Sequence, residues 1–353
     1  MKHLTFALFS MIFAASGCKS YEDAFNRNLN STGLYITNSA SNTVSMFAAD
    51  PKSGILNDLG TVSAGTTPVH VAVNSAGTFA YVVNSGSDDV YIYAVDKETR
   101  KLTFKSSASA GDNPRMIALH ATKNFAYVVN ENDDTISGYT LDSTTGAMTA
   151  MAGSPFASGA TTPRTLTVSS GTNSYVVLAD SGTNQVRLFD INATTGVINA
   201  NGTPAANLTG GALPLGVSVT GGSAPYIYAP CANGNVEYFA ISQWALAPLG
   251  KANIAAGTNP VFVAVNSDRT TALVSNSGSG NVSVFTMSSG ALTAAGTVTA
   301  CTTPAQIHIN SSNFAYLVCN GENKVNAYSV SGSSLNLVGS YSTGTQPTSV
   351  AGY

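Results

Sequence analysis

The sequence predicts an all-β protein built from one repeated four-stranded unit. Three observations lead to this prediction: few side chains are charged, a proline recurs about every 46 residues, and each interval holds four short apolar runs. Charged residues make up 9% of the chain, against about 25% in an ordinary domain, and 44% of the residues are hydrophobic. This balance argues against long exposed helices and against a disordered chain. The net charge of -3 gives no electrostatic footprint for nucleic acid.

The first segment of the chain predicts a targeting signal. An apolar run over residues 4–15 is too short to cross a bilayer core of about 30 Å and has the length of a signal-peptide core. The run ends in Ala-Ser-Gly-Cys18, which resembles the bacterial lipobox, although Ala stands where Leu is usual. The resemblance implies cleavage before Cys18 and lipidation of that cysteine, with ordinary cleavage after Gly17 as the alternative.

The predicted organisation is a lipoprotein signal peptide over residues 1–17, a lipidated polar tether over 18–30 and one folded domain over 31–353. We expect a monomer of the bacterial cell envelope that meets the membrane through its lipid anchor only, because no other stretch approaches 18 apolar residues. Lys19 replaces the Asp that marks inner-membrane retention in many bacteria, which favours the outer membrane.

A Gly-x-x-Pro-like segment opens each repeat. Tyr81-Val-Val-Asn84 begins thirteen residues after the first proline, and Ile227-Tyr-Ala-Pro230 is the match in the fourth repeat. An alternating run, a tight turn and a fourth run follow. Period-2 alternation and β-branched residues favour strands, and four short strands per unit are typical of a β-propeller blade. The prolines are Pro68, Pro114, Pro163, Pro214, Pro260, Pro304 and Pro347.

The two ends of the domain set the number of blades. Only six residues follow Pro347, enough for one strand. Three further strands are available at the start of the domain, in Tyr35-Ile-Thr-Asn38, in Val44-Ser-Met-Phe47 and after Gly54. Six complete repeats and one split repeat predict a seven-bladed β-propeller with four antiparallel strands per blade, whose last blade is closed by both termini. Closure removes free sheet edges.

The Tyr-Val-Val-Asn segments resemble the YVTN repeat. With the Gly-x-x-Pro opening and Tyr127-Val-Val-Asn-Glu131, they resemble the seven-bladed lactonase family, which includes 6-phosphogluconolactonase-like and muconate-cycloisomerase-like proteins. The resemblance covers residues 31–353 and is much more specific for the fold than for an activity.

Comparison of the repeats with one another isolates candidate functional residues. The position after each proline holds Arg115 and Arg164 in neighbouring repeats, and the position after Tyr-Val-Val-Asn holds Glu131, the only charge among its equivalents. The second strand returns antiparallel to the first, so these three side chains should meet at one mouth of the central channel. His308 stands where other repeats have small channel-facing residues, and His70 shares that strand parity.

Two interpretations of these residues remain open. The resemblance implies a site at this mouth that uses the arginines, the glutamate and histidines. Lactone opening needs a base, which His70 or Glu131 could be, and cations for the oxyanion, which Arg115 and Arg164 could be. However, no repeat holds the family's typical Pro-Arg-His. The alternative is a structural Arg115–Glu131 ion pair, with His70 and His308 wetting a water-filled channel.

The cysteines predict one disulfide. Cys301 replaces the Gly of Gly-x-x-Pro and Cys319 replaces the Asn of Tyr-Val-Val-Asn in the same repeat, so both should lie on one face of one blade. A bridge needs Cα atoms within about 7 Å, and export permits it. Cys231 would stay free. No zinc spacing, EF-hand spacing or phosphate loop appears, so we expect no metal and no cofactor.

Two classes of function follow. We favour an envelope-anchored, non-catalytic module that binds an unknown protein or small-molecule ligand at the channel mouth, because of the predicted anchor, the broken Pro-Arg-His pattern and the neutral surface. The alternative is a lactone hydrolase with 6-phosphogluconolactonase-like chemistry on an extracytoplasmic lactone. The phosphorylated sugar lactone itself is disfavoured, because it is cytoplasmic.

Overall fold

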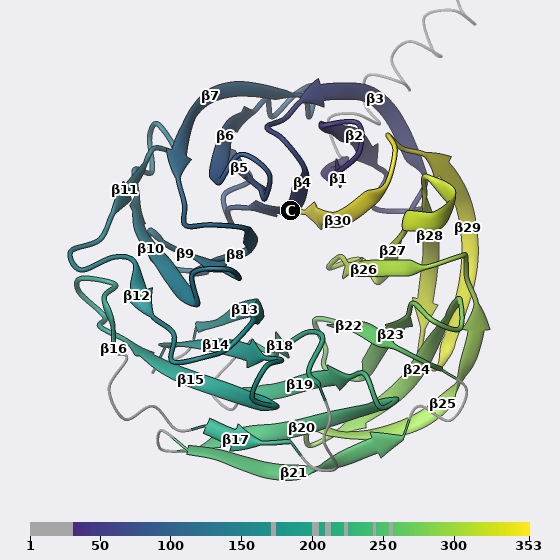
Figure 1. Ribbon diagram of the computed structural model, residues 1–353. Coiled ribbons are helices and arrows are strands. Elements are labelled where there is room, and N and C mark those ends of the chain that lie inside the picture. The colour runs from purple at the N-terminus through teal and green to yellow at the C-terminus, as the bar shows by residue number, and fades with distance from the viewer. Residues whose placement is uncertain are drawn as a thin grey trace, which may run out of the picture.

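Seven sheets form a ring around a central channel (Figure 1). The computed structural model describes residues 31–170, 174–199, 205–208, 213–221, 225–242, 245–253 and 257–353. The predicted signal peptide, the tether and Cys18 lie outside these residues. The predicted all-β, seven-bladed propeller with antiparallel blades is confirmed. Within the described ranges, no helix has the length and apolarity needed to cross a bilayer.

We number the blades in the order of their innermost strands along the chain, and give the strands of each blade from the innermost to the outermost. Blades 2 and 3 have an outermost strand in two pieces. Blades 1 to 3 are β4 (Pro68–Val73), β5 (Phe79–Asn84), β6 (Asp89–Val95), β7 (Leu102–Ser109); β8 (Pro114–Leu119), β9 (Phe125–Asn130), β10 (Thr135–Leu141), β11 (Met148–Ala150), β12 (Phe156–Ala157); and β13 (Pro163–Ser170), β14 (Ser174–Asp180), β15 (Gln185–Ile191), β16 (Ile198–Asn199), β17 (Ala205–Asn207). Blades 4 to 6 are β18 (Ser218–Val219), β19 (Tyr226–Cys231), β20 (Asn235–Ser242), β21 (Ala245–Asn253); β22 (Pro260–Val265), β23 (Thr271–Asn276), β24 (Asn281–Ser288), β25 (Ala291–Thr299); and β26 (Pro304–Ile309), β27 (Phe314–Cys319), β28 (Lys324–Ser331), β29 (Ser334–Ser342). Blade 7 is β30 (Pro347–Gly352), β1 (Thr32–Asn38), β2 (Thr43–Ala49) and β3 (Leu56–Ser63).

The split blade closes the ring. β30, at the end of the chain, pairs antiparallel with β1, and the register runs from Leu34 opposite Gly352 to Asn38 opposite Pro347. The sheet order is β3-β2-β1-β30, so one terminal segment supplies three strands and the other supplies the innermost strand. Figure 1 shows the yellow β30 beside the purple β1 and β2, as the repeat count predicted.

The second strand of each blade carries the core. β5 and β9 are buried at every position, because both of their faces pack against neighbouring blades. In four blades the tyrosine that opens the Tyr-Val-Val-Asn segment, or its equivalent, is buried, and its hydroxyl donates to a backbone carbonyl in the outer turn of the next blade. These bonds join Tyr35 to Arg100, Tyr81 to Gly146, Tyr127 to Gly196 and Tyr228 to Gly290. They lock adjacent blades together far from the channel.

The fourth blade corrects the repeat alignment. Pro214 bridges Cys231, and Tyr228 pairs with Ser218, as Tyr81 pairs with Ala72 in blade 1. The equivalent of Tyr81-Val-Val-Asn84 is therefore Tyr228-Ala-Pro-Cys231, one residue later than the sequence pattern indicated. Cys231 consequently occupies the asparagine position and not the position of Glu131.

A disulfide replaces a glycine–asparagine contact in blade 6. In blade 1, a Cβ on Gly65 would lie 2.6 Å from Cγ of Asn84, so only glycine fits against the asparagine. In blade 6 both positions are cysteine, and Cys301 and Cys319 are bonded with their Cα atoms 5.8 Å apart. Cys231 is free and buried. Burial raises the pKa of its thiol to about 12, which makes it a poor nucleophile.

Candidate functional site

A β-bulge at the start of the innermost strand in six of the seven blades shapes the channel mouth. In blade 2, Pro114 pairs with Asn130 and Met116 with Val129, so Arg115 is an extra residue without a partner in the ladder. The same shift occurs in blades 1, 3, 5 and 6 and where β30 meets β1. A bulge re-aims side chains, so both residues after the proline can face the channel. Strict alternation along the strand would direct only one of them there.

These paired positions line one pocket at the mouth, with a volume of about 250 Å³. This is slightly below the roughly 300–1,000 Å³ of pockets for drug-sized ligands, so it suits a small molecule. The lining contains His70, Arg115 and Arg164 from blades 1, 2 and 3. The pocket also contains Val69, Met116, Thr165, Leu215, Val261, Phe262, Ala305, Gln306, Thr348 and Ser349.

Glu131 joins two blades at the rim of this pocket. Arg115 Nε, from the same blade, lies 3.3 Å from Glu131 Oε2. Arg164 Nε, from blade 3, lies 3.0 Å from Glu131 Oε1. The arginine side chains are 38% and 45% exposed, whereas Glu131 is 12% exposed. The predicted meeting of these three side chains is therefore present in the structure, and the ion pair also braces neighbouring blades.

Sequence comparison missed Asn113 as a part of this cluster. Asn113 Nδ2 donates to Glu131 Oε2 at 3.1 Å. The residue adopts φ 53°, a left-handed conformation that asparagine tolerates better than most residues. Blade 5 holds the equivalent pair, in which Asn259 Nδ2 donates to Ser277 Oγ at 2.7 Å. That internal parallel was the available signal for a bond between these two positions.

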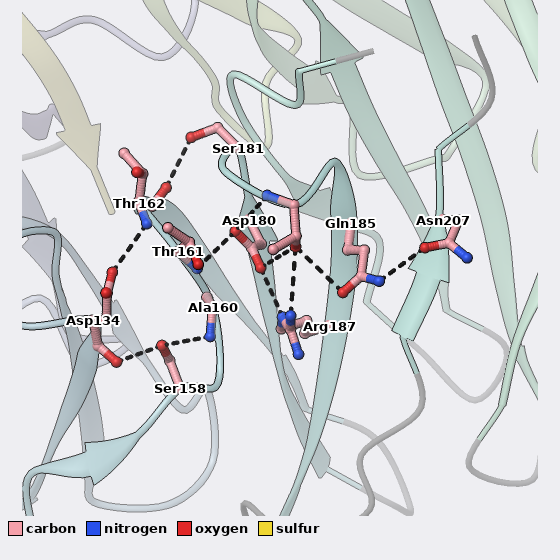
Figure 2. Close-up of polar contacts among 11 residues, drawn as sticks. Asp134, Ser158, Ala160, Thr161, Thr162, Asp180, Ser181, Gln185, Arg187 and Asn207 are labelled. Atoms are coloured by element: carbon pink, nitrogen blue, oxygen red, sulfur yellow. Dashed lines mark hydrogen bonds and ion pairs between the residues drawn. The ribbon is translucent and has the colours of Figure 1, made fainter. Parts of the chain in front are cut away.

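The turn before Arg164 is held by a network of side chains, drawn in Figure 2. Asp134 Oδ1 accepts the backbone N–H of Thr162 at 3.0 Å, and Ser181 Oγ donates to the carbonyl of Thr162 at 2.8 Å. Asp180 Oδ1 accepts the N–H of Thr161 at 3.1 Å. These bonds fix the backbone two residues before Arg164, so the guanidinium is presented by a rigid turn.

His70 is the uncommitted titratable group in the pocket. It is 8% exposed, and neither ring nitrogen has a hydrogen-bond partner within the described parts of the chain. Burial lowers its pKa to about 4, so the imidazole is neutral at pH 7. Thr165 Oγ1 is likewise buried and without a partner in those parts. Buried polar atoms normally have partners, so His70 and Thr165 are two unsatisfied groups beside one pocket that a polar ligand entering it could engage.

His308 does not join this group. It lies on β26, four residues after the proline, and is not among the residues that line the pocket. Its imidazole lies farther along the channel, beside Gly352, where an added Cβ would be 3.1 Å from His308 Nε2. Burial lowers the pKa of His308 to about 4, so this side chain is also neutral at pH 7.

The site therefore combines cations with a neutral base. Both Glu131 oxygens are engaged by Arg115, Arg164 and Asn113, which leaves His70 as the free proton acceptor. Each arginine uses Nε for the ion pair, and its Nη groups make no bond to a described residue, so they are free to bind a ligand oxygen. Among the described residues, no group of three His, Cys, Asp or Glu side chains could hold a metal ion.

The comparisons with known proteins agree with this fold. The family model of the seven-bladed β-propeller lactonases matches residues 23–162, which include Arg115, Glu131 and His70 but stop before Arg164. No curated protein matches the chain. The lactonase-like propeller predicted from the repeats is thus confirmed, over a match that spans less than half of the sequence.

Solved structures of other propellers cover nearly the whole domain. A candidate 6-phosphogluconolactonase from Bacteroides fragilis is 17% identical, with a TM-score of 0.80, and the match covers 92% of this chain and 98% of that one. A second, from Bacteroides uniformis, is 16% identical, with a TM-score of 0.79 over 92% and 100% of the chains. The periplasmic gluconolactonase of Pseudomonas aeruginosa is 14% identical, with a TM-score of 0.76 over 91% and 99%. At these identities the similarity establishes the fold alone.

Proposed function

We propose that the protein hydrolyses a small lactone at the channel mouth. The observation that carries the proposal is the placement of Arg115, Arg164 and the unpartnered His70 around one small pocket. The names of the similar structures, which include a periplasmic gluconolactonase, support the same reaction class. The alternative in the sequence analysis therefore becomes the preferred function.

The residues can be assigned roles in a balanced reaction. His70 accepts a proton from water as the water oxygen attacks the lactone carbonyl carbon. Arg115 and Arg164 donate to the oxyanion that develops on the carbonyl oxygen. Collapse of the intermediate breaks the bond between the carbonyl carbon and the ring oxygen. The leaving alkoxide takes the proton from the His70 imidazolium, and a hydroxy acid results.

Glu131 acts as a positioning residue in this scheme. Each of its two oxygens contacts the Nε of one arginine, which restrains the orientation of both guanidinium groups. A carboxylate already engaged by two cations and an amide would have to break those bonds before it could accept a proton. We therefore assign the base to His70 and leave Glu131 the task of aligning the cations.

The repeats supply variants that should fold. Arg115→Thr introduces the residue that blade 7 has at this position, His70→Gln the residue of blade 6, and Glu131→Ser the residue of blade 5. Residues 19–353 and each variant are assayed on a panel of lactones by acid release. Losing one oxyanion donor should lower kcat by about 10²–10³-fold, and losing the base by about 10²–10⁴-fold.

A matched control removes a cation elsewhere. Lys105→Thr deletes an exposed charge on β7 and should leave kcat unchanged. No turnover above background in the wild-type protein, or equal rates in the wild-type protein and Arg115→Thr, would reject the hydrolase proposal.

A binding protein without turnover is the second candidate. The observation in its favour is that Glu131 already neutralises part of the charge of the two arginines. Calorimetry with hydroxy acids, which are the products of lactone opening, distinguishes the two. Saturable binding that disappears in Arg115→Thr, together with no hydrolysis of any lactone, would favour this candidate.

We also propose that Cys18 is lipidated and that the propeller is tethered to the cell envelope, with the outer membrane favoured. The apolar run and Ala-Ser-Gly-Cys18 support this proposal. Metabolic labelling with a fatty acid should mark the wild-type protein but not Cys18→Ser. Equal labelling of both would contradict it.

A further inference from the structure

The channel mouth is chemically divided into two halves. The innermost strands follow one another around the ring as β4, β8, β13, β18, β22, β26 and β30 (Figure 1). The arginines and His70 come from blades 1 to 3, and blades 6 and 7 add the polar side chains of Gln306, Thr348 and Ser349. The lining from blades 4 and 5 is apolar and includes Leu215, Val261 and Phe262.

A glycine shapes the apolar half. Gly216 stands where other blades place the second channel-facing side chain, and a Cβ there would lie 2.6 Å from the carbonyl oxygen of Val261. Only glycine permits this approach of the backbone of blade 5 to blade 4. The wall between Leu215 and Phe262 is therefore closed by packed backbone and hydrocarbon, and these side chains carry no hydrogen-bonding group.

We propose that the preferred lactone carries an apolar substituent. Its carbonyl meets Arg115 and Arg164, and its substituent lies across the mouth against Leu215, Val261 and Phe262. This inference rests on the proposed function and specifies its substrate class: small alkyl- or aryl-substituted lactones in preference to polyhydroxylated sugar lactones.

The solvation of hydroxyl groups is the physical reason. A sugar lactone has a hydroxyl on most ring carbons, and each one buried against the apolar half loses water without gaining a partner. In that half, the described lining side chains offer no donor or acceptor. An alkyl group there instead removes apolar surface from water, at about tenfold in affinity for every one or two methylenes.

The test compares two substrates in four proteins. Glucono-δ-lactone and a δ-lactone with a short alkyl chain are assayed with the wild-type protein, Phe262→Ser, Leu215→Thr and Phe104→Ser. The first two variants introduce the residues of blade 7 at the same positions, so the repeat itself shows that they fit. Phe104 is 47% exposed on β7, outside the pocket, and controls for the loss of an exposed phenyl ring.

We expect the wild-type kcat/KM to be at least tenfold higher for the alkyl lactone. Phe262→Ser and Leu215→Thr should reduce that ratio about tenfold through KM, and Phe104→Ser should not change it. A preference for gluconolactone in the wild-type protein, or an unchanged ratio in Phe262→Ser, overturns the inference and leaves the hydrolase proposal standing.

Binding of the ring-opened products separates this inference from the hydrolase proposal. If no lactone is hydrolysed, calorimetry with the alkyl hydroxy acid and with gluconate still reports on the apolar half. Tighter binding of the alkyl acid, weakened in Phe262→Ser, upholds the apolar recognition although the hydrolase proposal fails. Equal or weaker binding of the alkyl acid overturns the recognition as well.

Discussion

The buried ion pair in blade 3 offers a sharp test of how the repeat tolerates charge. Asp180 occupies the asparagine position of Tyr-Val-Val-Asn and is completely buried. Arg187 Nε lies 2.9 Å from Asp180 Oδ2, and Figure 2 draws this ion pair. Three other blades use an uncharged pair at the same two positions, with an amide donating to a hydroxyl: Asn38 with Ser45, Asn130 with Ser137 and Asn276 with Ser283.

Arg187→Ser alone should destabilise the protein by about 3 kcal/mol, because a buried charge loses its partner. This is the lower end of the roughly 3–5 kcal/mol expected, since Asp180 keeps bonds from two backbone N–H groups and from the Thr183 hydroxyl. A propeller of about 320 residues has an unfolding entropy of about 0.7 kcal/mol/K, so the melting temperature should fall by about 4 °C.

The double variant Asp180→Asn, Arg187→Ser should recover most of this loss, because it recreates the amide–hydroxyl pair of the other blades. Asp180→Asn alone should also destabilise, since the Arg187 charge is then unpaired. Calorimetric melting of all four proteins completes a double-mutant cycle, with an expected coupling of at least about 2 kcal/mol. If the stability losses of the two single variants simply add in the double variant, Asp180 and Arg187 are not energetically coupled and the reasoning is refuted.

Three further predictions concern stability. Replacing Cys301 by Gly together with Cys319 by Asn restores the contact of the other blades but should cost about 3 kcal/mol of disulfide stabilisation; melting of this variant should be insensitive to reductant, and sensitivity would refute the assignment. His70 has a folded-state pKa of about 4, below its unfolded value, so its neutral burial stabilises above about pH 6.5 and is lost as pH falls toward 4. Between pH 7 and pH 4, the free energy of unfolding should therefore fall by up to about 3 kcal/mol less in His70→Gln than in the wild-type protein. Equal falls in the two proteins would exclude His70 as a source of the acid sensitivity. Tyr127→Phe leaves a buried carbonyl without a partner and should cost about 1–3 kcal/mol in chemical denaturation. Tyr316→Phe, whose hydroxyl is unpartnered within the described chain, should cost less than Tyr127→Phe, and equal losses would contradict the role of the bond.

The sequence predicted the parts of the fold that repeat. A recurrent proline fixes the start of each innermost strand, so the count of seven and the split blade followed from Pro347 and Tyr35. Blade 4 was misaligned because its inner strand, Ser218–Val219, is short and Tyr228 follows Pro214 by one residue more than Tyr81 follows Pro68. Counting residues from the proline cannot detect such a shift, because only the hydrogen bonds between two strands define which of their residues are paired.

The candidate site was predictable where a residue departs from its equivalents. Arg115, Arg164 and Glu131 were identified because charge is rare at their positions, and the structure brings them together. Asn113 escaped the search for outliers because asparagine also occurs at that position in blade 5, so the residue does not depart from its equivalents. The division of the mouth into polar and apolar halves also escaped, because it depends on the bulge that turns two consecutive side chains toward the channel.

The pairing of β30 with β1 has a consequence for how the protein folds. Six blades are built from strands that are adjacent in the sequence, and each can form by local hairpin closure. Blade 7 joins Leu34 to Gly352, so its inner pair is separated by nearly the whole propeller and carries the largest loop-closure entropy. Ring closure cannot occur before the last strand has been synthesised. Until then, the inner edge of β1 lacks its strand partner and is open to pairing with another chain.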